Sequence, residues 1–365
     1  MTSRDVDGAH PPEEVGADDG TARAALSRLV SVHRPARTDR HASPGPRAYR
    51  RDMETLPAIP LAEWRPTKET LHRYLQVVGK IRLAASARRN HWWNVPFHLT
   101  GRGLTTRPMS GGEDDRIFTI DLDLVAHELQ VAALDGRSVR FSLVGRSVAS
   151  FHDQTLSALD ELGVPVRIPL DHPFDLPDQN RPFTEDTEHR VYEAAHALRY
   201  WQVLSRVNLL LERFSAEFRG KISPVHHFWH TFDIAVTRFR GRPVPQSADT
   251  DPVTREAYSE EVISAGFWFG DDRVPEPTFY SYTAPEPEGL TGHPLEPAAA
   301  RWVEGGGGSH LAVLPYDAVR TAPDAEDQVL AFYRGAYRAG AASAGWDVDQ
   351  LACPAGITDP VLARS

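Results

Sequence analysis

Apolar residues recur with helical spacing in two segments of the chain that resemble each other. Residues 73–83 read RYLQVVGKIRL and residues 199–209 read RYWQVLSRVNL, so several residues coincide at an offset of 126 positions. The apolar positions of the first segment fall on one stripe of an α-helix: Leu71, Tyr74, Leu75, Val78 and Ile81. We therefore predict two helices and an internal duplication of the chain.

A similar aromatic segment follows each predicted helix. Residues 91–102 read HWWNVPFHLTGR and residues 227–238 read HFWHTFDIAVTR. In both, a histidine stands two positions before a tryptophan, and an arginine stands nine positions after that tryptophan. Aromatic and β-branched residues are enriched in strands, so each segment is predicted to be a β-strand.

The remaining elements follow in the same order in both halves. In the first half we predict strands at 117–124, 128–134 and 138–143, followed by a helix at 148–162 that ends at Gly163. In the second half we predict strands at 261–269, 278–283 and 310–314, followed by a helix at 325–339 that ends at Gly340. The predicted class is α+β, with antiparallel sheets packed against helices in two pseudo-symmetric helix–four-strand–helix repeats, 55–170 and 171–346.

The two ends of the chain lack this pattern. Residues 1–54 are predicted to be a disordered leader, and residues 347–365 a flexible tail. The stretch from 33 to 51 is basic and rich in proline but poor in large apolar residues, so it buries too little surface to offset its ordering entropy. A tail that binds nucleic acid or a partner is the alternative interpretation.

Composition excludes several classes of protein. The formal net charge is -10, which makes nucleic acid an unexpected main partner. There is no run of 18 apolar residues for a membrane span and no signal-peptide pattern at the N-terminus. The single cysteine, Cys353, cannot form an internal disulfide, so we expect a cytoplasmic location. Nucleotide-binding glycine motifs and the G-x-S-x-G elbow are also missing.

The densest polar cluster is the segment 223–233, SPVHHFWHTFD. As a helix, it would place His226 and His230 on one face at a metal-ligand spacing. As a strand, which we favour, it would point His226 and His230 to one side and Asp233 to the other. Imidazole suits iron or zinc, with Glu261 or Asp233 as a carboxylate ligand, so His226 and Glu261 are the candidate metal ligands. A hydrogen-bonded histidine without metal is the plainer interpretation.

Glu261 is also a candidate for acid–base chemistry. It shares a strand face with Ile263 and Ala265 in a segment whose alternation is imperfect. If that face is buried, the carboxylate must be paired or protonated. A perturbed carboxylate near His226 would be a plausible general base, so His226, Asp233 and Glu261 are the candidate catalytic residues.

Five further residues are candidates for binding a ligand. His91 and Trp93 lie in the first aromatic segment, where adjacent tryptophans would face opposite sides, one filling the core and one lining a cleft. Trp229 and Arg238 hold the matching places in the second segment, and Tyr282 lies near a strand end. Arg102 and Arg238 could bind an anion or form ion pairs with Asp121, Asp123 and Glu261.

Long motifs in the chain resemble a bacterial family known only as a domain of unknown function, number 5996. They are NHWWNVP at 90–96, GLTT at 103–106, VH at 225–226, FW at 228–229, FD at 232–233, TRF at 237–239 and EVISAGFW at 261–268. The resemblance covers residues 56 to 346 and implies no activity. The family pattern matches at His91, Trp93, His226, Trp229, Asp233, Arg238 and Glu261; it does not require His227 or His230, which weakens a His226–His230 metal pair.

These observations leave three hypotheses for function. The first is an enzyme that acts on a small molecule at a histidine, carboxylate and aromatic pocket between the two repeats, with or without a mononuclear iron or zinc ion. The convergence of His226 and Glu261 would support it. The second is a non-catalytic module that binds a small molecule, favoured by a large apolar cavity whose polar groups are already satisfied. The third is an interaction protein that forms homo-oligomers through exposed aromatic residues.

Overall fold

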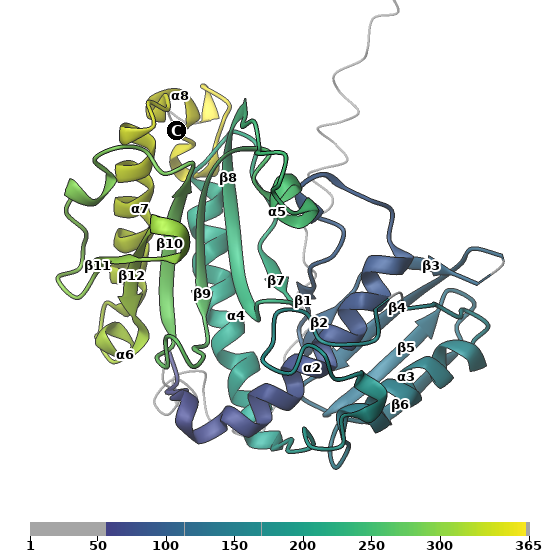
Figure 1. Ribbon diagram of the computed structural model, residues 1–365. Helices are drawn as coiled ribbons and strands as arrows, with labels where there is room; N and C mark the ends of the chain where they lie inside the picture. The colour runs from purple at the N-terminus through teal and green to yellow at the C-terminus, as the bar shows by residue number, and fades with distance from the viewer. Residues whose placement is uncertain (1–55, 113, 169, 363–365) are drawn as a thin grey trace, which may run out of the picture. The chain divides into compact units, whose positions relative to one another are not determined.

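Two antiparallel sheets and the helices that pack on them make up the part of the chain described by the computed structural model, residues 56–362 apart from 113 and 169 (Figure 1). The α+β class is therefore confirmed. The predicted leader, 1–54, lies outside the described residues. Among the residues described, no helix is both long enough and apolar enough to cross a bilayer.

The first sheet comes from the N-terminal half and has the order β1-β2-β4-β5-β6, with β3 also paired to β4. Its strands are β1 (His98–Leu99), β2 (Gly103–Thr105), β3 (Met109–Gly111), β4 (Arg116–Asp123), β5 (Glu128–Ala133) and β6 (Ser138–Ser142). On β4, Phe118, Ile120 and Leu122 are buried and alternate with more exposed residues. This alternation is typical of a sheet with one face on a core.

The second sheet comes from the C-terminal half and has the order β11-β12-β10-β9-β8-β7. Its strands are β7 (His226–Phe228), β8 (Asp233–Pro243), β9 (Glu260–Trp268), β10 (Thr278–Ala284), β11 (Arg301–Glu304) and β12 (His310–Pro315). Six consecutive residues of β9, Val262 to Phe267, are buried. The imperfect alternation of this strand in the sequence has a structural cause, because both faces of the sheet are covered.

Four long helices surround the sheets: α2 (Leu61–Ala85), α3 (Val148–Glu161), α4 (Ala194–Ala216) and α7 (Ala325–Ser343). Helices α4 and α7 pack together on one face of the second sheet (Figure 1). The short helices are α5 (Pro252–Ala257), α6 (Tyr316–Val319) and α8 (Val348–Leu351). Single turns of tighter helix, labelled η in order, lie at Asn90–Trp92, Phe183–Glu185, Leu290–Gly292, Gly306–Gly308 and Pro354–Gly356.

Helix α7 continues past the predicted end at Gly340. A Cβ atom on Gly340 would lie 2.0 Å from Thr283 Oγ1 on β10. The glycine therefore permits the close approach of α7 to the sheet, and does not end the helix. Gly345, with φ +65°, follows the last turn in the left-handed conformation that commonly ends helices.

Of the two aromatic segments predicted as strands, the first is mostly turn, so that prediction was wrong, and the second is mostly strand but is interrupted by a turn at 229–232. In the first, His91 and Trp92 have φ of 53° and 58° within the turn Asn90–Trp92, and only His98 and Leu99 pair as a strand. In the second, β7 ends at Phe228 and β8 begins at Asp233, with Phe232 at φ 60° between them. The aromatic pattern marked the walls of a cavity, as described below.

The two halves share the order helix, antiparallel sheet, helix, but each sheet has six strands where four were predicted, and a pseudo-twofold relation between the halves stays a prediction. The halves join where Phe97 and His227 exchange backbone hydrogen bonds of 2.8 and 3.1 Å beside β1 and β7. The segment assigned to a tail contains α8. Cys353 is buried there, and its N–H donates to the carbonyl of Glu217.

Candidate ligand-binding cavity

A cavity of about 970 Å³ lies against the face of the second sheet opposite to α4 and α7. Alternate residues of the central strands form its floor, because side chains point to opposite faces along a strand. The floor residues are Asp233, Ala235, Thr237 and Phe239 on β8, Val262, Ser264 and Trp268 on β9, and Thr278, Tyr280 and Tyr282 on β10. The intervening residues, such as Ile234, Ile263 and Phe279, are buried on the helix side.

The walls of the cavity come from turns that the sequence had suggested as strands. Trp93 follows the turn Asn90–Trp92, and Trp229, His230 and Thr231 belong to the β7–β8 turn. Helix α5, which packs on the first of these turns, contributes Val253 and Ala257. Its N-terminus is held by Asp251, whose Oδ1 accepts from the N–H groups of Val253 and Thr254 at 2.9 and 3.0 Å.

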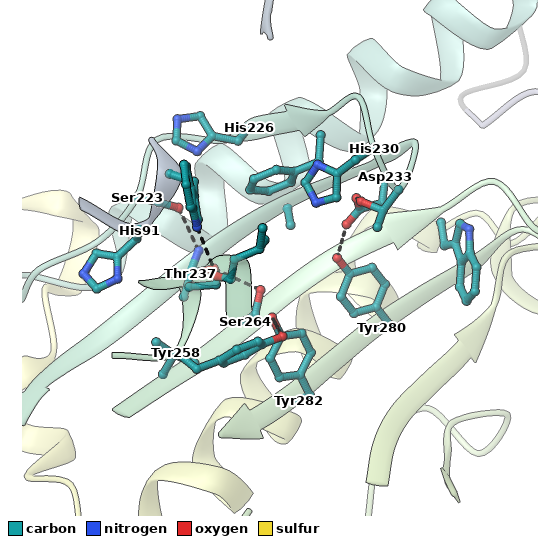
Figure 2. Close-up of a pocket in the computed structure, with 18 of the residues that line it drawn as sticks. His91, Ser223, His226, His230, Asp233, Thr237, Tyr258, Ser264, Tyr280 and Tyr282 are labelled. Carbon is teal, nitrogen blue, oxygen red and sulfur yellow. Dashed lines mark hydrogen bonds between the residues drawn. The ribbon is translucent and has the colours of Figure 1, made fainter. Parts of the chain in front are cut away.

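Asp233 is the carboxylate of the cavity floor. Its Oδ2 accepts a hydrogen bond from the Tyr280 hydroxyl (Figure 2). Its Oδ1 accepts one from the Thr231 hydroxyl. Burial raises the pKa of Asp233, and the hydrogen bonds from Thr231 and Tyr280 oppose that rise. Asp233, a candidate catalytic residue from the sequence, therefore lines the cavity with two hydroxyl partners instead of a histidine.

A row of hydroxyl groups crosses the floor beside Asp233 (Figure 2). The Thr237 hydroxyl lies 3.0 Å from the Ser264 hydroxyl, and the Thr237 N–H donates to the Ser223 hydroxyl at 2.9 Å. The Tyr258 hydroxyl donates to the Tyr282 hydroxyl at 3.3 Å. These groups largely satisfy one another, so they form polar points on an otherwise apolar floor.

The Tyr280 ring reaches Asp233 because β9 has a glycine beneath it. Gly266 pairs with Tyr280, and a Cβ atom on Gly266 would lie 2.5 Å from the tyrosine ring and hydroxyl. The rings of Tyr280 and Tyr282 stack with centroids 6.3 Å apart. Both tyrosines line the cavity; Tyr282 was a candidate from the sequence and Tyr280 was not.

His226 lies on β7 opposite Ala235 and faces the cavity. It is 1% exposed, and its Nδ1 has no hydrogen-bond partner among the described residues. Burial lowers its pKa to about 3, with smaller contributions from His98 and three arginines. The imidazole is therefore neutral at pH 7, and Trp93 contacts it edge-on with centroids 6.3 Å apart.

His91 closes another part of the cavity through a network of hydrogen bonds. Its Nδ1 lies 3.2 Å from the carbonyl oxygen of Glu256, which can only accept, so Nδ1 donates. Its Nε2 then accepts from Lys221 Nζ at 2.7 Å, and the same ammonium donates to Glu260 at 2.5 Å. His91 is thus a fixed wall residue whose ring nitrogens are both engaged.

Trp229 is buried against helix α2, and Lys80 from that helix also reaches the cavity. The Trp229 indole Nε1 has no partner among the described residues. Burial lowers the pKa of Lys80 to about 8, while Asp171 raises it. Lys80 was not among the residues predicted from the sequence, because a lysine on a helix is ordinarily expected to be solvated.

Glu261 does not belong to the cavity, so its pairing with His226 was wrong. Glu261 lies on the helix side of β9, where its carboxylate accepts from Arg240 at 3.0 Å and lies 3.3 Å from Arg242. His226 aligns across β8 with Gly266, five residues further along β9, or roughly 17 Å at the strand rise. The two residues cannot ligate one metal ion, and the proposed iron or zinc site at His226 and Glu261 is not formed.

Arg238 also lies on the helix side and does not line the cavity. It is 2% exposed, donates through Nη2 to the carbonyl of Phe214, and lies 3.6 Å from the centre of the Phe214 ring. Burial lowers its pKa to about 10. Its suggested counterpart Arg102 is exposed and pairs with Asp123 at 2.5 Å, one of the ion pairs expected from the sequence.

One triad with metal-ligand geometry occurs among the described residues, formed by Asp178, Asp186 and His189. Arg73 already lies against it, at 2.5 Å from Asp178 Oδ1 and 3.6 Å from Asp186 Oδ2. A guanidinium therefore compensates the two carboxylates, and the triad is explained as a structural ion-pair cluster.

Comparison with known families matches residues 56–353 to DUF5996, described as a family of unknown function. A comparison with curated proteins and one with solved structures each gave no match.

Proposed function

Because the chain belongs to DUF5996, a family of unknown function, we propose a function from the geometry of its cavity: it binds a small molecule with a largely apolar, flat body. The observation that carries this proposal is the alternation of floor residues over three strands, which gives a concave site of about 970 Å³. That volume lies within the range of small-molecule sites in proteins.

The chemistry of the lining supports an apolar ligand. Its aromatic residues include Trp93, Phe228, Trp229, Phe239, Trp268 and Tyr282. Aromatic walls stack against flat rings or straight hydrocarbon chains. The floor hydroxyls bond to one another, so a ligand need not bring many polar groups to replace lost hydrogen bonds.

From the sequence alone, an enzyme was the first hypothesis and a binding module the second. The features of the cavity favour the binding module. The His226–Glu261 pair on which the enzyme hypothesis rested is absent, while an apolar cavity whose floor hydroxyls bond to one another is close to the feature expected of a binding module. The predicted tryptophans Trp93 and Trp229 line a hollow instead of a flat patch, which ranks a homo-oligomeric aromatic surface third. We also keep as proposals a cytoplasmic location and the absence of nucleic-acid partners.

Proton transfer at Asp233 is a second candidate function. The observation that favours it is a carboxylate in the cavity whose pKa is raised by burial and which is oriented by Tyr280 and Thr231. The test is incubation of the protein with a metabolite extract, followed by mass spectrometry. Compounds consumed by the wild type and untouched by Asp233→Asn would establish turnover; equal consumption by both proteins would rule out Asp233 as the catalytic group.

The binding proposal is tested with the neutral apolar dye Nile red and a variant that fills the cavity. Ala235 is buried on the floor opposite His226, so Ala235→Phe places a ring in the hollow. We expect the variant to bind the dye at least tenfold more weakly, because the loss of apolar contact area between dye and cavity lowers affinity. Ala126→Phe, at an exposed turn residue, is the matched control and binds as the wild type does. Equal binding by Ala235→Phe would overturn the proposal.

A further inference from the structure

A second pocket, of about 470 Å³, lies beside the end of helix α2. Its lining brings together five basic or imidazole side chains, Arg82, Arg89, Arg107, His98 and His226. No aspartate or glutamate is among the described residues that line it. In a chain with a formal net charge of -10, this is a local concentration of positive charge that the overall composition does not explain.

Arg82 is the central residue of this pocket. It is 4% exposed, and its Nε and Nη1 atoms are buried without a hydrogen-bond partner among the described residues. The Ser86 hydroxyl, one turn further along the chain, is likewise buried and unpartnered. A buried guanidinium without an anion is costly, so a compensating acceptor is expected from outside the described residues.

The charged side chains among the described residues that line the pocket, Arg82, Arg89 and Arg107, are all positive. Burial and then Arg107 lower the pKa of Arg82 to about 10. Burial lowers the pKa of His98 to about 3, with further contributions from Arg107, Arg82 and Arg89. No carboxylate of the described residues is among the charges that shift the pKa of Arg82 or His98. The pocket therefore has the field of an anion-binding site.

The pocket shares a wall with the larger cavity. Trp93 and His226 line both hollows. His226 also has an unpartnered Nδ1 at this boundary and contacts His98 edge-on, with centroids 5.2 Å apart. A single ligand could therefore lie with its body on the sheet and one end among the arginines.

We propose that the second pocket binds an anionic oxygen group, a phosphate or a carboxylate, at the end of the ligand whose apolar body occupies the larger cavity. This inference rests on the proposed function for the identity of the ligand, but not for the binding of the anion itself. The planar guanidinium of Arg82 can donate two parallel hydrogen bonds to either group. Arg107, held at φ 62° with its N–H donating to the Thr105 hydroxyl, is positioned to add a second cation.

The experiment uses calorimetry on the full chain in a buffer free of oxyanions, with inorganic phosphate, benzoate and phenyl phosphate as probes and chloride holding ionic strength constant. We expect phosphate or benzoate to bind, and whichever binds more tightly identifies the headgroup chemistry. Phenyl phosphate should exceed inorganic phosphate if the body lies in the larger cavity. Absence of binding by all three probes would overturn the proposal.

Variants locate the binding. Arg82→Met should weaken binding of the tighter probe at least tenfold, because it removes charged hydrogen bonds, and should raise the melting temperature in probe-free buffer by removing an uncompensated charge. Arg107→Gln, at an exposed position, should weaken binding about threefold to tenfold and serves if Arg82→Met fails to fold. Arg102→Met, an exposed arginine with its own carboxylate partner, should change binding less than about twofold.

The two proposals can fail separately. Nile red binding with no oxyanion binding would overturn the anion site and leave the apolar cavity standing. Oxyanion binding that is lost in Arg82→Met, without Nile red binding, would support the anion site and overturn the proposed function. Oxyanion binding that Arg82→Met and Arg107→Gln leave unchanged would place the ion elsewhere and contradict the proposal.

Discussion

At the scale of single residues, the cavity separates polar groups that are satisfied from those that are not. Asp233, Thr237, Ser264 and Tyr282 all have partners within the protein. The exceptions include His226 Nδ1 and Trp229 Nε1, which are buried and unpartnered among the described residues. Because buried polar groups normally have hydrogen bonds, such exceptions are where ligand atoms are expected.

The Asp233–Tyr280 hydrogen bond gives a prediction at this scale. Tyr280→Phe should lower the free energy of unfolding at pH 7 by about 1–3 kcal/mol, since it removes a donor from a carboxylate enclosed by protein. In an Asp233→Asn background the same substitution should lower the free energy of unfolding by a smaller amount, because no charge is then left unpaired. Urea unfolding of the four proteins measures this coupling, and additive effects would mean that the hydrogen bond does not form.

The sign of the pH effect at Asp233 follows from its raised pKa. The folded state favours the protonated acid, so this group favours folding below its unfolded pKa, and that contribution is lost as the pH rises through the folded value. Asp233→Asn should therefore stabilise the protein at pH 7 relative to the wild type and have little effect near pH 3. Unfolding curves at the two pH values provide the check, and a variant less stable than the wild type at pH 7 would contradict this assignment.

At the scale of secondary-structure elements, the sequence predicted regular strands well and irregular segments poorly. The boundaries of β4, β5, β6, α3, β9, β10 and β12 agree with the predicted ranges to within one residue. The short strands β2, β3 and β11 were not predicted. The other failures are the turns at 90–92 and 229–232, where His91, Trp92 and Phe232 adopt positive φ. Bulky residues seldom occupy that region, so their composition predicted strands.

The sequence predicted only some of the residues that line the cavity. His91, Trp93, His226, Trp229, Asp233 and Tyr282 do line the cavity. Glu261 and Arg238 do not line the cavity. The sequence could not assign the side on which they lie, because a strand buried on both faces shows no alternation of apolar and polar residues. The second pocket could not have been predicted, since it joins residues 82–117 to 224–226 through tertiary contacts.

Helix α7 offers a matched pair of substitutions that tests its packing on the sheet. Gly340→Ala should destabilise the protein by about 1–3 kcal/mol, because its Cβ would collide with the Thr283 side chain. Gly335→Ala, in the same helix with open space around it, should be neutral or stabilising by about 0.5–1 kcal/mol through reduced backbone entropy. Chemical denaturation measures both, and equal effects would contradict the close packing of α7 on β10 in Figure 1.

At the scale of the whole molecule, buried histidines couple the fold to pH. Burial is the largest cause that lowers the pKa of His98, His226 and His227 to about 3 each. In the unfolded chain they titrate near 6.5, so the unfolded state binds more protons between these values. Stability should fall as the pH drops below about 6.5, with a slope approaching about 1.4 kcal/mol per pH unit for each histidine.

Urea unfolding between pH 8 and pH 5 tests this coupling. His226→Gln should reduce the slope by about one proton, because it removes one group that charges only on unfolding. A flat profile between pH 7 and pH 5 in the wild type would show that these histidines titrate normally in the fold.

The proposed function depends on the second sheet, because its two faces have different roles. One face packs on α4 and α7, and the other forms the floor of the cavity, with the arginine pocket adjoining it at Trp93 and His226. We therefore predict one ligand class, an apolar body with an anionic end.

The decisive experiment is to incubate tag-free protein with a cell extract, wash it, and identify the retained compounds by mass spectrometry, alongside Ala235→Phe. We predict that the wild type retains an apolar compound carrying a phosphate or carboxylate, and that Ala235→Phe does not. Retention of the same compounds by both proteins, or by neither, would contradict the proposed binding of such a ligand on the second sheet.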